Sequence, residues 1–364
     1  TRNRGLVVDT AVDENDGVTV GGISLRDAIA EAADTDPAET ITFASGLSGA
    51  TVGLVQGQLL IDKNLAIDGS ALPDGITLSG NNTSRILEIT SGPTVNLDSL
   101  TLTAGAVGPG AAIRTEGTLT LNRSTVSGNT ADEEGGGIYN GGDLTITNTT
   151  LFGNSAAISG GAVYQAGGTL VLEHVTLSGN GSLGAAGGLA LAGGDLTLAN
   201  SLLAGNTAAS AGPDLLNGVG PITLLGANLV GDLADSGLSA GPAVLTGPAR
   251  LGSFADNGGP TKTMVLLPGS PAIDAGGATT LPTDQRGFER TLAAGPDLGA
   301  YEAAAGSYNA VGLTLYAEID PTLSGSGVLF EISPDPDFLP TVSTLAGTGT
   351  IGSGDGVRSV AEFK

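Results

Sequence analysis

The chain has 364 residues, of which 61 are glycine, 40% are hydrophobic, 14% are charged and 3% are aromatic. An ordinary globular enzyme carries about 25% charged residues and a disordered chain has few aliphatic ones, so we expect an ordered core of small aliphatic side chains. The formal net charge of −24 argues against nucleic acid and anionic lipid as partners. Because cysteine is absent, disulfides and thiolate metal sites are excluded.

The N-terminal part of the chain predicts an exported protein with one short helix. The sequence begins at Thr1, which fits removal of a signal peptide, and no apolar run reaches the ~20 residues of a membrane span. Residues 23–34 predict a helix with Ser24 as its N-cap and Asp27 in the capping-box position. Its apolar stripe is expected to cover the first turn of the structure that follows.

A repeat occupies the middle of the chain. Four segments align, and each contains a Gly-Asn pair; they are residues 118–130, 143–155, 169–181 and 195–207. Apolar residues alternate within them, which predicts short strands whose corners are marked by Gly and Asn. With no helix between the strands, the arrangement that fits is a β-solenoid. Looser turns extend the pattern over residues 41–255, and we expect roughly eight turns in all.

In a solenoid each residue lies about 4.8 Å from its counterpart one turn earlier. Leu, Ile and Val are therefore expected to stack inside, and Thr and Asn outside. The asparagines of the Gly-Asn pairs are predicted to form a structural ladder at the corners, because their side-chain amides can bond to one another. These ladder residues are Asn129, Asn154, Asn180 and Asn206.

Charged residues return in the segment 256–302. Asp284, Arg286 and Asp297 stand out, and we expect Arg286 to pair with Asp297 or Asp274 and to pin an irregular cap onto the last turn. A functional site built from the same charges is the alternative.

The tail, residues 303–364, contains two runs that predict strands, 311–320 and 327–333. A lone pair of strands is marginally stable, so we expect either a neighbouring subunit to accept the tail as an added strand or the tail to pack on its own rod.

Several stretches resemble a group of bacterial exported parallel β-helix proteins. The sequence GGISLRDAIAEA is similar to their CSLREAI-type N-terminal motif, and GGGIYN and LFGNS resemble the repeats of polymorphic outer-membrane proteins. The segments 256–276, 283–290 and 295–302 resemble the signature of choice-of-anchor Q domains, and 341–364 resembles the start of an NHL repeat. The resemblance implies a secreted, right-handed parallel β-helix at a cell surface and implies no catalytic residues.

Glycan cleavage is the main enzymatic alternative. A polyuronate lyase needs cations to bind uronate carboxylates and usually a Lys or Arg as base, but no Lys or Arg lies between Arg123 and Arg250. Hydrolysis needs two carboxylates about 5 to 10 Å apart. Asp143 and Asp195 occupy equivalent positions two turns apart with Thr169 between them, and a turn-forming role is favoured for both. No catalytic residue is therefore expected.

Three further groups have simple structural interpretations. Asp132, Glu133 and Glu134 are weak candidates for a Ca²⁺ site, but a solvated loop is favoured because Ca²⁺ needs six to eight oxygen ligands. His174, the only histidine, is expected at a surface or ladder position. Tyr139 and Tyr164 lie at equivalent positions one turn apart and are expected to close a corner, with a small external stack as the alternative.

The sequence thus predicts four parts: an N-terminal strand and capping helix (1–40), parallel β-helix turns (41–255), a C-terminal cap (256–302) and a β-strand tail (303–364). We expect an extracellular structural or adhesive protein, with self-association through the tail or with cell-surface and glycan contacts, and with no cofactor beyond a possible Ca²⁺. A glycan-binding or glycan-cleaving module is the alternative.

Overall fold

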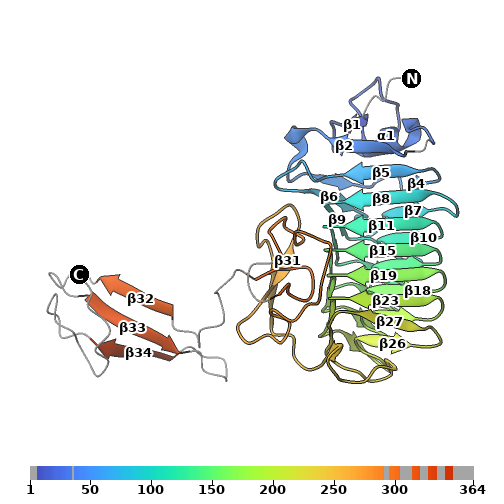
Figure 1. Cartoon of the computed structure of the whole chain (residues 1–364). Helices are drawn as coiled ribbons and strands as arrows, with labels where there is room; N and C mark the ends of the chain where they lie inside the picture. Colours follow the sequence, from blue (N-terminus) through green and yellow to red (C-terminus); the bar gives the residue numbers. More distant parts are fainter. Residues whose placement is uncertain are drawn as a thin grey trace. The chain divides into compact units, whose positions relative to one another are not determined.

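A computed structural model describes residues 6–34, 37–290 and 295–303 in full, and the backbone of three strands between 314 and 346. The chain forms two compact units, Thr1–Ala303 and Ala304–Lys364. The first unit is a β-solenoid of about seven turns built from parallel sheets, which confirms the predicted fold (Figure 1).

Three long sheets form the walls of the solenoid. Sheet A consists, in spatial order, of β1 (Leu6–Val8), β2 (Glu39–Phe43), β5 (Leu65–Asp68), β8 (Thr94–Asp98), β11 (Thr118–Asn122), β15 (Asp143–Thr147), β19 (Thr169–Glu173), β23 (Asp195–Ala199) and β27 (Ile222–Leu225). Sheet B consists of β3 (Thr51–Gly53), β6 (Ile76–Ser79), β9 (Leu100–Thr103), β12 (Thr125–Ser127), β16 (Thr150–Phe152), β20 (Thr176–Ser178), β24 (Leu202–Leu203), β28 (Asn228–Val230) and β29 (Val244–Leu245).

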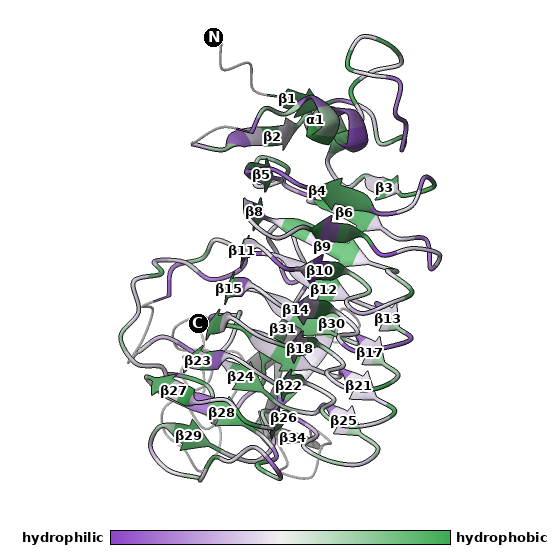
Figure 2. Cartoon of the chain, turned by 90° about the vertical axis from the view of Figure 1, so that its right-hand side faces the viewer, coloured by the Kyte–Doolittle hydropathy of each residue, from purple (hydrophilic) through white to green (hydrophobic). Residues whose placement is uncertain are grey.

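Sheet C consists of β4 (Leu59–Ile61), β7 (Leu87–Ile89), β10 (Ile113–Thr115), β14 (Ile138–Asn140), β18 (Val163–Gln165), β22 (Leu189–Leu191) and β26 (Leu215–Asn217). A narrow fourth sheet, sheet D, follows one corner through β13 (Thr130–Ala131), β17 (Ser155–Ala156), β21 (Gly181–Ser182) and β25 (Thr207–Ala208). Figure 2 shows sheets C and D from outside, with successive turns stacked along the rod.

The alternation of the repeat places one face of each strand in the core. Leu119, Leu144, Leu170 and Leu196 stand in register on neighbouring strands of sheet A, and each is at most 1% exposed. The residues that alternate with these leucines along each strand point outward. Thr120 on β11 and Thr145 on β15, for example, are in register with each other on the outer face. Period-two alternation therefore builds a continuous aliphatic core along the rod.

Helix α1 (Leu25–Glu31) covers the N-terminal end of the core. Ser24 is its N-cap: the Ser24 side chain accepts from the Asp27 backbone N–H, and the Asp27 side chain accepts from the Ser24 backbone N–H. Leu25, Ala28 and Ile29 are at most 5% exposed and join the main core cluster. The helix is shorter than the predicted range 23–34; a single 3-10 turn follows at Ser45–Leu47.

The regular stack ends one turn earlier than expected. Sheet A stops at β27, and after β28 only the two-residue strand β29 continues sheet B. The chain then forms an antiparallel pair, β30 (Leu251–Ala255) with β31 (Thr263–Leu266). Residues 241–252, predicted as further turns, therefore leave the solenoid part way through, because their backbone turns to pair with β31.

The predicted cap, which we call the strap (residues 256–290 and 295–303 of the described chain), does not cover the last turn. It runs back along the side of the rod against the outer face of sheet B (Figure 1). Gly277 lies beside Asn200, Thr283 beside Asn148, and Thr261 beside Arg123, so the strap crosses successive turns. The predicted end-on position is therefore wrong.

The second unit contains a three-stranded antiparallel sheet of β32 (Thr314–Ile319), β33 (Gly327–Ser333) and β34 (Thr341–Ala346). The two predicted strands thus have a third neighbour, which lies in the segment that resembles an NHL repeat. Residues 347–364 of that segment lie outside the described residues.

Candidate functional site

The asparagines of the Gly-Asn pairs form a continuous chain of hydrogen bonds along one corner. Nδ2 of Asn129 donates to Oδ1 of Asn154 at 2.8 Å, Asn154 donates likewise to Asn180 at 2.9 Å, and Asn180 to Asn206 at 2.9 Å. Backbone N–H groups of the same residues donate to the same oxygens. The ladder is buried rather than outside, because each amide also donates inward to a backbone carbonyl, such as that of Val126.

A second column of corner residues joins sheet A to sheet B. Arg123, Asn148, His174 and Asn200 occupy it on four successive turns, each with a left-handed backbone of φ between 46° and 52°. Asn adopts this conformation readily, whereas Arg and His adopt it at some cost. The strap lies along this column, so these residues are where the strap is fastened to the rod.

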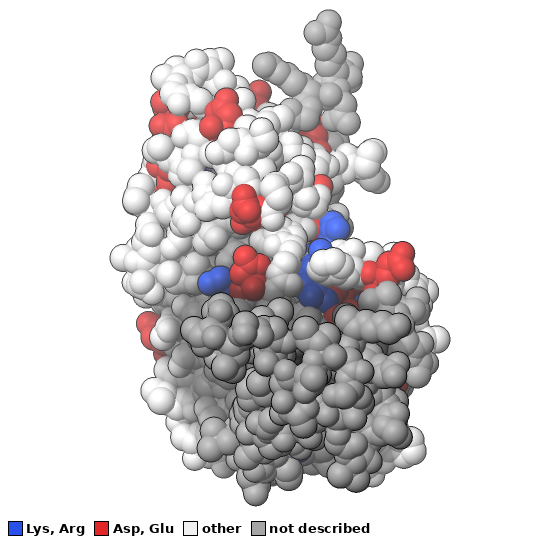
Figure 3. Space-filling model, turned by 90° about the vertical axis from the view of Figure 1, so that its left-hand side faces the viewer, with Lys and Arg blue, Asp and Glu red and all other residues white. Residues whose placement is uncertain are grey.

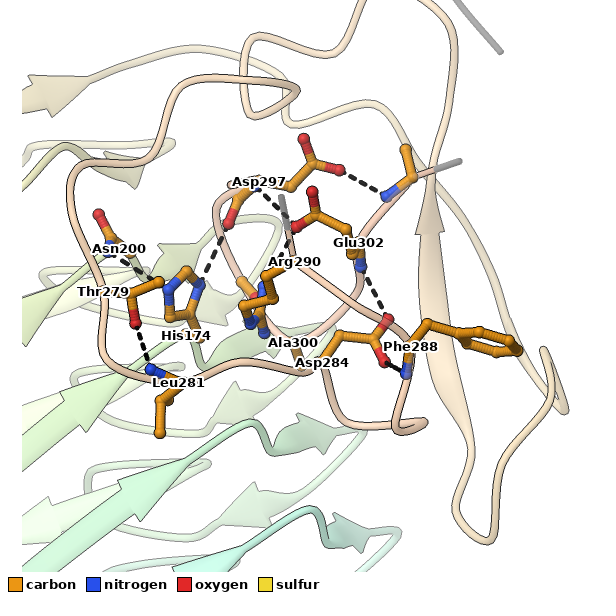
Figure 4. Close-up of polar contacts among 12 residues, drawn as sticks. His174, Asn200, Thr279, Leu281, Asp284, Phe288, Arg290, Asp297, Ala300 and Glu302 are labelled. Atoms are coloured by element: carbon orange, nitrogen blue, oxygen red, sulfur yellow. Dashed lines mark hydrogen bonds and ion pairs between the residues drawn. The ribbon is translucent and has the colours of Figure 1, made fainter. Parts of the chain in front are cut away.

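Arg290 is the centre of that attachment. Its side chain is fully buried; Nη2 donates to Oδ1 of Asn148 at 2.6 Å and to the Gly299 carbonyl at 3.1 Å. Nη1 lies 3.5 Å from Oε2 of Glu302 (Figure 4). Burial lowers the pKa of Arg290 to about 10, so the guanidinium stays charged at neutral pH. A buried cation with these partners binds the strap to the rod, and no substrate reaches it.

His174 is enclosed by the strap, so the expected surface position is wrong, whereas the ladder position holds. Its Nδ1 lies 3.2 Å from the Asp297 carbonyl and its Nε2 lies 3.3 Å from Nδ2 of Asn200. A neutral ring that carries its proton on Nδ1 satisfies both contacts. Burial, together with the charge of Arg290, lowers the pKa of His174 to about 3.

The expected ion pair between Arg286 and Asp297 or Asp274 is not formed. Arg286 binds Asp284 instead, with Nε and Nη2 at 2.8 and 2.6 Å from Oδ2. Its guanidinium also lies 3.6 Å from the Tyr301 ring centroid. A tight turn closes this pair, because Oδ1 of Asp284 accepts the backbone N–H of Arg286 and of Phe288.

Asp297 uses its carboxylate to hold the strap's own backbone. Oδ1 accepts from the N–H of Asp274 at 2.7 Å and Oδ2 from that of Ala303 at 2.6 Å. Burial raises the pKa of Asp297, and burial next to Asp297 raises the pKa of Glu302 to about 8. Perturbed pKa values often mark active sites, but these two residues are at most 2% exposed, so their role is to order the strap.

Tyr139 and Tyr164 form an external stack, and not the corner that was favoured. They are in register on β14 and β18, with ring centroids 5.6 Å apart and planes inclined by 15°. Arg114, one turn earlier, lies 5.9 Å from the Tyr139 ring and pairs with Glu116 at 2.9 Å.

Asp143 and Asp195, the candidate catalytic pair, are exposed and lie at the starts of strands β15 and β23 of sheet A. Thr169, between them, donates both its N–H and its hydroxyl to Oδ1 of Asp143, at 3.0 and 2.8 Å. This is a contact that orders the start of a strand, in line with the favoured interpretation.

The predicted acidic cluster is spread out. Asp132 accepts the N–H of Gly108, whereas Glu134 lies near Tyr139 and Tyr164 and contributes to raising the pKa of both. Within the described ranges, the one set of three potential metal-ligand side chains is Glu14, Asp16 and Asp27, whose ligand oxygens lie within 4.8 Å of one another.

The sequence interpretation missed Arg290 and Gln285 as strap anchors. Gln285 accepts from the Thr150 hydroxyl and donates to that of Thr125, on neighbouring strands of sheet B. Alignment of the repeats could have identified the rod side of this contact, because Thr125, Thr150 and Thr176 are outward-pointing yet recur at one position. No comparable periodic signal marks the strap side.

The described helices do not include one with the length and apolarity needed to cross a bilayer. On the face shown in Figure 3, acidic side chains are scattered, and most of the basic side chains lie near one another, with a separate basic patch apart from them. No known protein family, curated protein or solved structure matches the chain.

Proposed function

We propose that this chain is an extracellular structural and adhesive protein of a bacterial cell surface. The proposal rests on one observation: the buried polar side chains of the rod and the strap are engaged in contacts that stabilise the fold. These side chains form ladders and strap contacts, and the clustered buried acids, Asp284, Asp297 and Glu302, are enclosed. The resemblance of the N-terminal motif, the repeats and the strap segment to exported β-helix proteins supports the same role.

The outer face of sheet A is suited to contact with a long, flat surface. Its central outward column runs over eight strands and contains no charged residue: Thr40, Ala66, Asn96, Thr120, Thr145, Val171, Thr197 and Thr223. Short β-branched side chains in register make such a face flat and poorly flexible. An adhesive surface of this kind needs no cofactor.

Self-association through the C-terminal unit is part of the proposal. The sheet of that unit has two edge strands, β32 and β34, and edge strands pair readily with another chain. A contact between this unit and a different surface of the next copy is head to tail and therefore propagates.

Negative-stain microscopy and light scattering of the purified full chain test this, with a chain ending at Ala303 as the control. Filaments formed by the full chain and lost in the shorter one are the expected result. If both chains form filaments, the self-association contact lies on the rod and not on the C-terminal unit. If both chains are monomers, self-association is refuted and only the adhesive role is left. Binding of the labelled protein to bacterial or host cells then tests that role.

A further inference from the structure

A cavity of about 710 Å³ opens near the C-terminal end of the rod, apart from the strap's ionic cluster. Its lining includes short side chains on successive turns, namely Ser178, Ala204, Gly205 and Gly231, and the segment 247–251 that leads into β30. This volume lies within the usual range of about 300 to 1,000 Å³ for small-molecule sites. Short side chains leave that space open to a ligand.

The cavity lies where the asparagine ladder ends, since Asn206 and Asp214 both line it. Asn206 donates its N–H and Nδ2 to Oδ1 of Asp214, at 3.0 and 2.8 Å, and the Asp232 N–H donates to Oδ2 at 2.8 Å. Asp214 follows Asn206 by only eight residues, so a loop and not a further full turn supplies the last acceptor. These contacts fix a buried carboxylate in the wall, with its hydrogen-bonding capacity largely used.

Arg250 lines the same cavity and differs from the other described arginines. Its Nη1 makes one long contact, 3.4 Å to the Pro268 carbonyl, and its side chain is exposed. Each of the other arginines in the described ranges has a carboxylate within 4.0 Å: Arg26, Arg85, Arg114, Arg123, Arg286 and Arg290. In a chain of net charge −24, an arginine left without such a partner at a cavity is available to a ligand anion.

Asp232 brings the opposite charge to the cavity lining. One of its oxygens accepts the Ala234 N–H at 2.8 Å, and among the described ion pairs none joins Asp232 to Arg250. The exposed Thr207 and the buried Asn206 add hydroxyl and amide groups nearby. Because the Asn206 amide is already bonded within the ladder, the polar side chains left for a ligand include those of Arg250, Asp232 and Thr207.

We propose that this cavity binds an acidic sugar residue, of the uronic or sialic acid class. The guanidinium of Arg250 binds the sugar carboxylate in the two-pronged geometry that arginine favours, and Asp232 accepts ring hydroxyls. A sulfate or phosphate fits less well, because two carboxylates line the cavity, and sulfate offers them no donor whereas phosphate offers fewer donors than a sugar with several hydroxyl groups. The inference rests on the proposed adhesive function, for which it names a ligand class.

Isothermal titration calorimetry of the full chain tests the proposal, with glucuronic acid, galacturonic acid and N-acetylneuraminic acid as probes. Glucose and inorganic phosphate are the comparison ligands. We expect a Kd of about 1 mM for at least one acidic sugar, as is reasonable for a single small ligand with few contacts. Glucose and phosphate are expected to bind at least tenfold more weakly.

Arg250→Gln is expected to weaken acidic-sugar binding about tenfold, and Asp232→Asn a few-fold. The matched control is Arg123→Gln, which breaks an arginine–carboxylate pair with Asp98 outside the cavity and should leave binding unchanged. Thermal melting confirms that each variant is folded. Equal binding of glucose, no heat with any acidic sugar up to about 20 mM, or undiminished binding by Arg250→Gln would overturn the site. Cell adhesion by a parent chain that binds no acidic sugar would refute this site and leave the adhesive function standing.

Discussion

Nη2 of Arg290 lies 2.6 Å from Oδ1 of Asn148, so that residues 142 positions apart in the sequence share a buried hydrogen bond. Asn148 belongs to a corner of the rod and Arg290 to the strap. Nδ2 of Asn148 also donates to the Thr283 carbonyl at 3.0 Å, so the same corner residue holds both ends of a strap loop. This pair is the most direct link between the two parts of the unit.

Replacing Arg290 with Met is expected to lower the free energy of unfolding by about 2 to 6 kcal/mol, because Oδ1 of Asn148 and the Gly299 carbonyl would each be left buried without their donor, at about 1 to 3 kcal/mol apiece. Urea denaturation followed by circular dichroism measures the loss. The control is Arg123→Met, which removes a half-exposed pair with Asp98 and should cost no more than about 1 kcal/mol. Similar losses in both variants would show that the buried Arg290 contact stabilises the fold no more than an exposed ion pair does.

Asn154→Ala interrupts the ladder at its centre. The N–H and Nδ2 of Asn129 both lose their acceptor, and each buried donor left unpaired costs about 1 to 3 kcal/mol. Asn96→Ala, at an exposed position on sheet A, is the control and should fall within about 0.5 kcal/mol of the parent. A midpoint of denaturation for Asn154→Ala no lower than that of Asn96→Ala would argue against a stabilising ladder.

His174 predicts a loss of stability in acid. The pKa of His174 is about 3 in the folded chain and 6.5 in the unfolded chain. Between these two pH values the unfolded chain therefore binds a proton that the folded chain does not bind. Stability conferred by the neutral ring is therefore lost as the pH falls from 6.5 towards 3. His174→Asn, which matches Asn148 and Asn200 in the same column, should flatten the decline in melting temperature between pH 6.5 and 4. A parallel decline in both proteins would contradict this origin.

Glu302 predicts the opposite slope. Its pKa is raised from 4.5 to about 8, so between these values the folded chain binds a proton that the unfolded chain has released. The contribution of Glu302 to stability is therefore complete below about pH 4.5 and is lost as the pH rises through 8. Glu302→Gln keeps the uncharged form at every pH and should melt with less change between pH 6 and 9. If the parent and the variant respond alike, Glu302 titrates normally.

The periodic parts of the molecule were predictable because every turn repeats the same alternation of buried apolar and exposed polar residues. Leu144 and Ile146 are buried by alternation, and Ser24 and Asp27 form the capping box from their spacing alone. The burial of Asn154 was not predicted, because an asparagine at a corner reads as exposed until its partners above and below are counted.

The strap was beyond the reach of sequence reasoning. Its contacts join residues more than 100 positions apart, such as Arg290 and Asn148, and no period relates the two. Arg286 was predicted to pair at a distance, but the geometry of a tight turn gave it Asp284, two residues away. The repeat pattern describes only the stacked turns. It therefore could not predict the local turn at Asp284 or the long-range packing of the strap.

A stack of turns ordinarily frays from its ends, because each turn contacts only its neighbours. Here the strap is bonded to four successive turns, at Arg123, Asn148, His174 and Asn200. Those turns cannot peel away one at a time from the C-terminal end while the strap is in place. The strap therefore converts a one-dimensional array into a segment that opens as a whole, which suits the structural role proposed above.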